Sequence, residues 1–284
     1  VIDNHGPDVL VTPKDSIVFC SPANPNYLPA LSDWIQRRAG LIAKDSCTPD
    51  PALVYSMEIN NATIDSAQVV AAFLASYASG CSAQQIGSQT YQKVHGLVSV
   101  NFYATDACGN TSLIGNADFG LIDTVPPTLT GNPVTEECGG GNDQTALISW
   151  INSQGNAAAT DVCSAFTWTN FSWATSSGQT GTGQFNTGPY PVILANNCTW
   201  HTDVTFRATD DCGNTGSVSL RFSITDMTPP VIAGLQPVDT LFCPNTTPPT
   251  PTANVTDDCD VSVAITSNFQ IVNPVCSDAY SLLI

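Results

Sequence analysis

The sequence has few basic residues and no long apolar run. Lys and Arg together number 7 against 24 Asp and Glu, which gives a formal net charge of −17 over 284 residues. So acidic a chain argues against nucleic acid and against an anionic membrane surface as partners. No apolar stretch approaches the ~20 residues that a membrane-spanning helix needs, so we predict no membrane insertion.

The residues that usually carry catalysis or zinc binding are also scarce. The 3 histidines are scattered and none of the 11 cysteines forms a C-x-x-C pair, so zinc ligation is not expected. Glutamate is rare and no G-x-S-x-G motif occurs, so we predict no enzymatic activity, no catalytic residue and no required cofactor. The cysteines therefore indicate disulfides and an oxidising, extracellular setting.

One pattern occurs twice, as FYATDACGNTSLIGNADFGLIDTVPP (residues 102–127) and FRATDDCGNTGSVSLRFSITDMTPP (residues 206–230). Apolar and polar residues alternate on both sides of D-x-C-G-N, which is typical of a β-hairpin with one buried face. The closing D-x-x-P-P ends the second strand, because proline donates no ladder hydrogen bond and holds the chain extended. A last strand followed by a stiff exit, used twice, predicts an all-β chain of tandem domains.

The spacing from Asp3 to Cys20 equals that from Asp226 to Cys243. We therefore expect the chain to start within an array of repeats. The predicted boundaries are residues 1–3 for the end of a preceding repeat, 4–125 and 126–228 for two full repeats, and 229–284 for a shorter, partial third.

Each full repeat is expected to carry a short helical insertion. The stretch 31–47 aligns without gaps to 147–163, and Leu31, Trp34 and Ile35 share one helical face, as do their counterparts. Both tryptophans are interpreted as core residues rather than as ligand platforms. Ser32 is the predicted N-cap of the first helix, and Asn142 or Asp143 that of the second. Gly40 and Gly155 are predicted to end these helices.

The two repeats are expected to differ after these insertions. Residues 65–80 are Ala-rich, with Asp or Ser at the start and Gly at the end, which favours a second helix over a buried strand. The Gly/Thr/Ser-rich stretch 176–191 is expected instead to form a surface hairpin.

Four cysteines in a repeat allow three pairings, and spacing alone does not choose among them. The third repeat has Cys243 and Cys259 but lacks the hairpin, which favours disulfides that close short loops within each repeat. Each such bond would stabilise the fold by about 3 kcal/mol. The predicted bonds are Cys20–Cys47, Cys81–Cys108, Cys138–Cys163, Cys198–Cys212 and Cys243–Cys259, with Cys276 pairing beyond residue 284.

The residues YATDACGN…DTVPP and RATDDCGN…DMTPP, together with FCP at 242–244 and TDDC at 256–259, resemble the hyalin-type (HYR-like) repeat. The version with a tryptophan-containing helix looks like the repeats of large surface adhesins of Bacteroidota, including gliding-motility adhesins. The resemblance implies immunoglobulin-like β-sandwich domains and an exported cell-surface protein, by a type IX-like route. The final strands lack a cysteine that many hyalin repeats carry, so that family's disulfide pattern is not transferred.

Two kinds of ligand site are predicted from residue type. Carboxylates near turns suit Ca²⁺, although Asp also favours turns for its own backbone hydrogen bonds. D-S/T before an apolar residue resembles an O-glycosylation motif. The calcium candidates are Asp106, Asp123, Asp210, Asp211 and Asp226, and the glycosylation candidates are Ser16, Ser66, Thr124 and Thr240.

These patterns predict a structural and adhesive protein, a rod or filament of stapled repeats. Its expected partners are the neighbouring repeats of the same chain and a surface or polysaccharide ligand. A carbohydrate-binding module of a secreted enzyme, with exposed aromatic residues stacking on sugars, is an alternative. A subunit that polymerises into an extracellular fibre is a further alternative.

Overall fold

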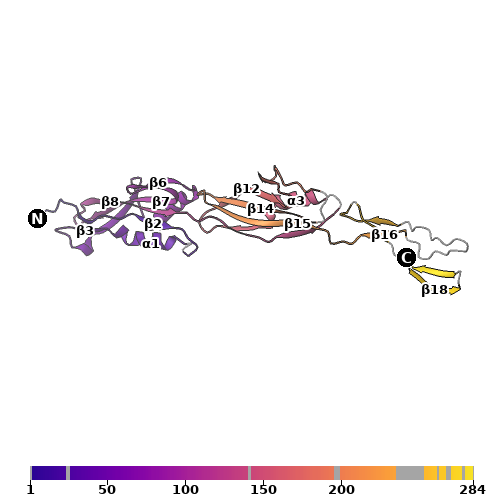
Figure 1. The fold of residues 1–284 in the computed structure, drawn as a ribbon. Coiled ribbons are helices and arrows are strands. Elements are labelled where there is room, and N and C mark those ends of the chain that lie inside the picture. Colours follow the sequence, from indigo (N-terminus) through magenta and orange to yellow (C-terminus); the bar gives the residue numbers. More distant parts are fainter. Residues whose placement is uncertain are drawn as a thin grey trace. The chain divides into compact units, whose positions relative to one another are not determined.

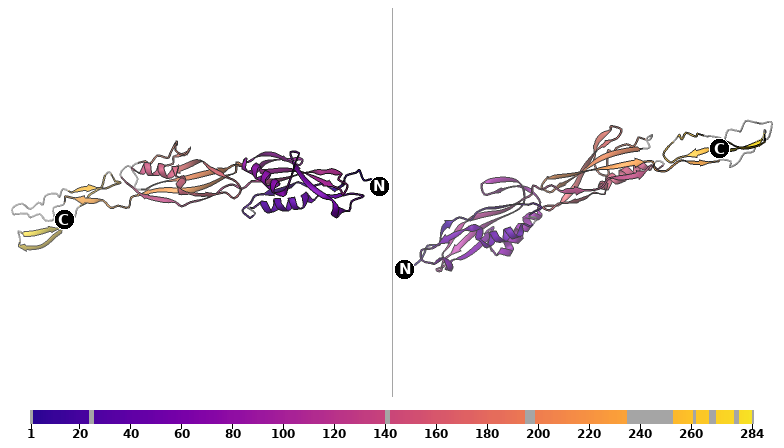
Figure 2. Two further views of the ribbon diagram at one scale, coloured as in Figure 1. Left: turned by 180° about the vertical axis from the view of Figure 1, so that it is seen from behind. Right: turned by 60° about the horizontal axis from the view of Figure 1, so that its bottom comes forward.

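The computed structural model describes residues 2–23, 26–139, 142–194, 199–234, 253–260, 262–266, 270–276 and 279–283 (Figures 1 and 2). The chain divides into two compact units. The first unit contains Val1–Thr130, Ala157–Asn170 and Arg207–Val218, and the second contains Gly131–Asn156, Phe171–Phe206 and Ser219–Ile284. The first unit thus combines the whole first repeat with residues 126–130, 157–170 and 207–218 of the second.

The main sheet of the first unit has the strand order β2-β8-β7-β4-β5, with β6 pairing with β7. The predicted hairpin is present, because β7 and β8 pair antiparallel around the D-x-C-G-N turn. β2 runs parallel to β8, from Ser16 beside Phe119 to Phe19 beside Ile122. The strands are β2 (Ser16–Phe19), β4 (Val54–Ile59), β5 (Ala62–Ile64), β6 (Ser82–Ile86), β7 (Gln89–Thr105) and β8 (Thr111–Ile122).

Both predicted helices of the first repeat form, as α1 (Leu28–Gln36) and α2 (Ser66–Ala78). Asp65 caps α2 in a full capping box with Gln68, which confirms the helix over the buried strand. The predicted start of α1 is wrong. Ser32 lies inside the helix, and Tyr27 occupies the N-cap position.

One face of this sheet is covered by α1 and α2 (Figure 2). Trp34 of α1 is 7% exposed and packs with ring centroids 5.7 Å from both Phe102 and Phe119. Phe73 of α2 is fully buried and meets Phe119 at 5.6 Å. Trp34 is therefore a core residue, as predicted.

The sheet of the second repeat has the order β10-β15-β14-β12-β13, again with a parallel first strand, because β10 runs parallel to β15. Of the predicted surface hairpin at residues 176–191, only β13 is a strand, and it pairs antiparallel with β12, which precedes the predicted stretch. The strands are β10 (Val134–Glu137), β12 (Phe166–Thr175), β13 (Thr180–Gly183), β14 (Thr199–Asp210) and β15 (Thr215–Thr225).

Helix α3 (Asp143–Asn152) packs on the part of this sheet that lies in the second unit. Trp150 is 6% exposed, and its ring centroid lies 5.4 Å from that of Phe206 and 5.3 Å from that of Phe222, which confirms its core role. Asn142 occupies the predicted N-cap position, but its side chain makes no capping hydrogen bond.

The same two-stranded pairing opens all three repeats. A strand after the proline segment (Asp3–Pro7, Asp123–Pro127 or Asp226–Pro230) pairs antiparallel with a strand just before the D-x-C segment, even in the third repeat, whose sequence contains no tryptophan. The pairs are β1 (Asp8–Val11) with β3 (Ile42–Lys44), β9 (Thr128–Thr130) with β11 (Ala158–Thr160), and β16 (Val231–Ala233) with β17 (Asn254–Thr256).

The remaining elements are short. They are β18 (Gln270–Cys276), which pairs with β19 (Ala279–Leu283), and the 3-10 turns Arg38–Gly40, Asp50–Ala52 and Gln154–Asn156. Gly40 and Gly155 lie in two of these turns with positive φ, just beyond the helices that they were predicted to stop. The described structure is therefore mainly β, with several sheets and short helices. Among the described helices, none has the length and apolar character needed to cross a membrane.

Candidate functional site

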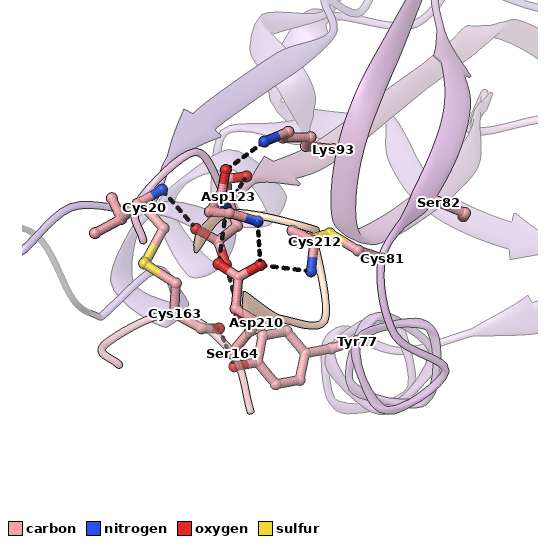
Figure 3. The surroundings of a disulfide bond; sticks show 12 residues. Cys20, Tyr77, Cys81, Ser82, Lys93, Asp123, Cys163, Ser164, Asp210 and Cys212 are labelled. Atoms are coloured by element: carbon pink, nitrogen blue, oxygen red, sulfur yellow. Dashed lines mark hydrogen bonds between the residues drawn. A yellow bond between two sulfur atoms is a disulfide. The ribbon is translucent and has the colours of Figure 1, made fainter. Parts of the chain in front are cut away.

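Two disulfides of the first unit join residues of successive repeats (Figure 3). Cys20 is bonded to Cys163 with Cα atoms 5.9 Å apart, and Cys81 is bonded to Cys212 with Cα atoms 4.8 Å apart. Between them lies Asp123, the first residue of D-x-x-P-P. We call this cluster the cross-linked junction; it comprises Cys20, Cys81, Asp123, Cys163, Asp210, Cys212 and Asn214.

The predicted pairing of Cys20 with Cys47 is wrong, and the parallel strand β2 explains why. Because β2 runs parallel to β8, it delivers Cys20 to the end of β8, where the Cys20 N–H donates to Ile122 O at 2.9 Å. Cys47 lies at the start of β8, because Thr48 Oγ1 accepts from the N–H of Ala107 in the hairpin turn at 3.1 Å. The 12 residues of β8 separate the two ends, a span of about 35 Å that no disulfide bridges.

The predicted pairing of Cys81 with Cys108 fails for the same reason. Cys81 precedes β6, whose first residue Ser82 pairs with Val94, and Val94 in turn pairs with Ile122. Cys81 is therefore at the same end of the sheet as Cys20, whereas Cys108 lies in the turn at the other end. Cys47 and Cys108 are both exposed free thiols.

The other predicted bonds are also contradicted or lie outside the described residues. Cys138 bonds to Cys259, with Cα atoms 5.7 Å apart, and this bond joins the second repeat to the third within the second unit. Cys163, Cys212 and Cys259 thus have other partners than predicted. Cys198 and Cys243 lie outside the described residues, as does the side chain of Cys276.

The D-x-C-G-N turn is held by its own aspartate. Asp210 Oδ1 accepts from the N–H groups of Cys212 at 2.9 Å and Asn214 at 2.7 Å, and its Oδ2 accepts from Asn214 Nδ2 at 2.8 Å. Gly213 has φ of +77° and allows the chain to reverse here. The turn therefore presents Cys212 in a fixed position.

Asp123 is fully buried in the junction. It lies in the segment that connects the first repeat to the second, which we call the linking chain, and it binds the segments around Ser164 and Asn214. Its Oδ2 accepts from Ser164 Oγ at 2.7 Å, its Oδ1 from Val125 N–H at 2.9 Å, and its carbonyl from Asn214 Nδ2 at 3.2 Å. Burial raises the pKa of Asp123, the bonds from Ser164 and Val125 oppose this, and the charge of Asp210 adds to it. A buried carboxylate with these partners is a structural element that costs stability when ionised.

Two side chains of the first repeat, Tyr77 and Lys93, form hydrogen bonds with the segments that carry Cys163 and Cys212 (Figure 3). The Tyr77 hydroxyl donates to Cys163 O at 2.6 Å, and Lys93 Nζ donates to Asn214 Oδ1. His95 packs against Tyr77 with ring centroids 4.1 Å apart, is 3% exposed, and neither ring nitrogen has a hydrogen-bond partner. Burial lowers the pKa of His95, although the carboxylates of Asp123 and Asp211 pull it upward.

The predicted calcium ligands do not converge on one site. The carboxylate oxygens of Asp106 and Asp210 accept hydrogen bonds from backbone N–H groups and an Asn side chain of their own turns. Asp123 is near Asp161, but the third member of that group, Cys163, is disulfide-bonded. Asp226 fits a hard cation best, because one of its carboxylate oxygens lies within 4.8 Å of one oxygen each of Asp257 and Asp260. Sequence reasoning missed Asp161 and Asp257, although both stand two residues before a cysteine, like Asp210.

The glycosylation candidates differ in accessibility. Ser66 and Thr124 are exposed, Ser16 is half-buried at the start of β2, and Thr240 lies outside the described residues. Ser66 and Thr124 are therefore accessible for modification.

No family model matches the sequence, and no curated protein matches it. Similar solved structures include cadherin domains 1-4 of protocadherin gamma B7, at 13% identity over 99% of this chain and 68% of that chain, with a TM-score of 0.27. The fibronectin(III)-like modules of Clostridium thermocellum CbhA match at 10% identity over 78% of this chain and 94% of that chain, with a TM-score of 0.21. The Ig1-2 module of Drosophila DLAR matches at 11% identity over 78% of this chain and 100% of that chain, with a TM-score of 0.19. At such low TM-scores these likenesses carry no argument about fold or function.

Proposed function

We propose that the chain belongs to a non-enzymatic, extracellular structural and adhesive protein, built as a rod or filament of tandem immunoglobulin-like repeats on the cell surface. The observation that carries this proposal is the cross-linked junction. Successive repeats are joined there by three covalent connections: the linking chain through Asp123, and the disulfides Cys20–Cys163 and Cys81–Cys212.

A chain joined in this way suits mechanical work. With a single linking segment, tension or bending at the junction would act on weak contacts, whereas disulfides on either side of Asp123 carry it through covalent bonds. The bonds need an oxidising compartment, which supports an extracellular location. The acidic composition favours mutual repulsion between neighbouring filaments.

Surface location and attachment test this proposal together. Antibodies raised against the 284-residue chain should label intact, unpermeabilised cells of the source, and a deletion strain should attach less well to a solid or polysaccharide-coated surface. A complemented strain is the control. Antigen found only inside permeabilised cells, or unchanged attachment by the deletion strain, would overturn the proposal.

Calcium binding is a further proposal, and the group around Asp226 is the part of the chain that supports it. The carboxylates of Asp226, Asp257 and Asp260 could supply oxygen ligands to Ca²⁺ and stiffen the exit from the second repeat. Calorimetric titration of the chain with CaCl₂ should give binding at about 10⁻⁴–10⁻³ M, which Asp226→Asn should abolish. If the unaltered chain gives no heat of binding, the group around Asp226 does not bind Ca²⁺.

A further inference from the structure

The free thiols Cys47 and Cys108 occupy the positions in the first repeat that the bonded Cys163 and Cys212 occupy in the second. The segment around Cys47 is built like its counterpart. Asp45 Oδ1 accepts from the N–H groups of Cys47 at 2.9 Å and of Thr48 at 2.6 Å. Asp161 Oδ1 accepts from Cys163 and Ser164 in the same way, at 2.8 Å each.

The two hairpin turns are also matched, bond for bond. Asp106 Oδ1 accepts from the N–H groups of Cys108 and Asn110 at 2.8 Å each, and its Oδ2 accepts from Asn110 Nδ2 at 2.7 Å. Asp210 holds Cys212 and Asn214 with the same three bonds. The geometry that presents Cys212 to its partner therefore exists at Cys108.

The chain that enters the first repeat follows the path of the linking chain between the repeats. Asn110 Nδ2 donates to the carbonyl of Asp3 at 3.3 Å, just as Asn214 Nδ2 donates to the carbonyl of Asp123 at 3.2 Å. Asp3 Oδ2 is buried without a hydrogen-bond partner, whereas Asp123 Oδ2 accepts from Ser164. The structure thus reproduces the receiving half of the cross-linked junction around Asp3. We call this surface the open face; it comprises Asp3, Asp45, Cys47, Asp106, Cys108 and Asn110.

We propose that the open face docks a further module of the same repeat, joined to the chain through Asp3, whose counterparts of Cys20 and Cys81 form disulfides with Cys47 and Cys108. Each bond forms between two thiols, which lose two electrons and two protons to a disulfide oxidant such as oxidised glutathione, itself reduced to two thiols. The inference deepens the proposed function, since it states how the modules of such a filament are joined.

The surroundings of Cys108 favour bonding to a docked partner over exchange with disulfides in solution. Desolvation and the nearby charge of Asp106, followed by those of Asp3, Cys47 and Asp45, raise the pKa of Cys108. A thiol with a raised pKa is a poor nucleophile at neutral pH, because little thiolate is present. Holding the partner sulfur in place, as the matching turn holds Cys212 beside Cys81, compensates for this low reactivity.

A tandem duplication tests the proposal. Residues 1–123 are placed directly before residues 4–284, so that Asp123 of the added copy takes the place of Asp3. Cys47→Ser and Cys108→Ser are introduced in the added copy alone, which leaves one Cys47 and one Cys108 in the protein. The protein is refolded with oxidised and reduced glutathione, alkylated, and digested without reduction for mass spectrometry.

The expected result is a Cys20–Cys47 peptide pair and a Cys81–Cys108 peptide pair, both dependent on the added copy. In a matched control with Cys20→Ser and Cys81→Ser in the added copy, Cys47 and Cys108 should be fully alkylated. Cys20–Cys163 and Cys81–Cys212 pairs in the same digest show that the protein has folded. In that folded protein, free Cys47 and Cys108, or a bond between them, would overturn the proposal. This map is made on purified protein, so it can fail while the attachment experiment succeeds, and the reverse.

Discussion

The turn from Asp106 to Asn110 and the turn from Asp210 to Asn214 have the same hydrogen bonds but different cross-links. Cys212 is bonded to Cys81, whereas Cys108 is an exposed thiol. Because each aspartate organises its own turn, the local structure does not depend on the disulfide. The D-x-C-G-N turn therefore keeps the same hydrogen bonds with and without a disulfide at its cysteine.

Removing the bond between Cys20 and Cys163 should have the largest effect. The two residues are 143 apart, and a loop of that length corresponds to about 5 kcal/mol in the chain-entropy account. Cys20→Ser with Cys163→Ser should lower the free energy of opening of the first unit by about 3–5 kcal/mol, read from hydrogen exchange of β7 and β8 peptides. Cys47→Ser with Cys108→Ser is the matched control and should leave that exchange unchanged. Equal losses in both pairs would mean that the bonded and the free cysteines contribute equally to the stability of the first unit.

Replacing the turn aspartates should destabilise both turns, but by different amounts. Asp210→Ala and Asp106→Ala each remove an acceptor of three hydrogen bonds, which should cost about 2–3 kcal/mol in either turn. Asp210→Ala should cost more, because Asn214 also accepts from Lys93 and the turn carries the bond to Cys81. Hydrogen exchange of the two turn peptides measures the loss of stability caused by each substitution. A larger loss for Asp106→Ala would contradict this ordering.

Tyr77→Phe should have a smaller effect, confined to the cross-linked junction. It removes the 2.6 Å hydrogen bond from the hydroxyl to Cys163 O but keeps the packing against His95. The loss should be about 1 kcal/mol, measured by the same exchange experiment. Tyr103→Phe, on the sheet far from the junction, serves as a control for loss of a tyrosine hydroxyl.

The smallest expected effect is a dependence on pH. Burial lowers the pKa of His95 below its ordinary 6.5, so the unfolded state binds its proton first and the first unit loses stability as the pH falls below about 6.5. The raised pKa of Asp123 acts in the opposite direction, because its buried charge costs stability only above about pH 4. His95→Leu should flatten the decline in stability between pH 7 and pH 5. The decline is measured by thermal unfolding at a series of pH values. An unchanged slope would show that His95 does not titrate in that range.

The hairpins, both tryptophan helices and α2 follow from local sequence, because alternation, helical spacing and the Asp65 cap act over a few residues. The disulfides do not, because they depend on which strands pair. The parallel pairing of β2 with β8 places Cys20 and Cys47 at opposite ends of the repeat, and no local pattern in Ser16–Phe19 signals it. The repetition nevertheless held a usable signal. Cys163 and Cys212 share the D-x-C context of Cys47 and Cys108, whereas Cys20 and Cys81 do not.

The disulfide map of the chain shows directly whether the cross-linked junction forms. The 284-residue protein is folded under oxidising conditions, alkylated and digested without reduction. We expect the pairs Cys20–Cys163, Cys81–Cys212 and Cys138–Cys259, with Cys47 and Cys108 recovered as alkylated thiols. Recovery of Cys20–Cys47 and Cys81–Cys108 would mean that each repeat is stapled within itself, and the cross-linked junction would not exist.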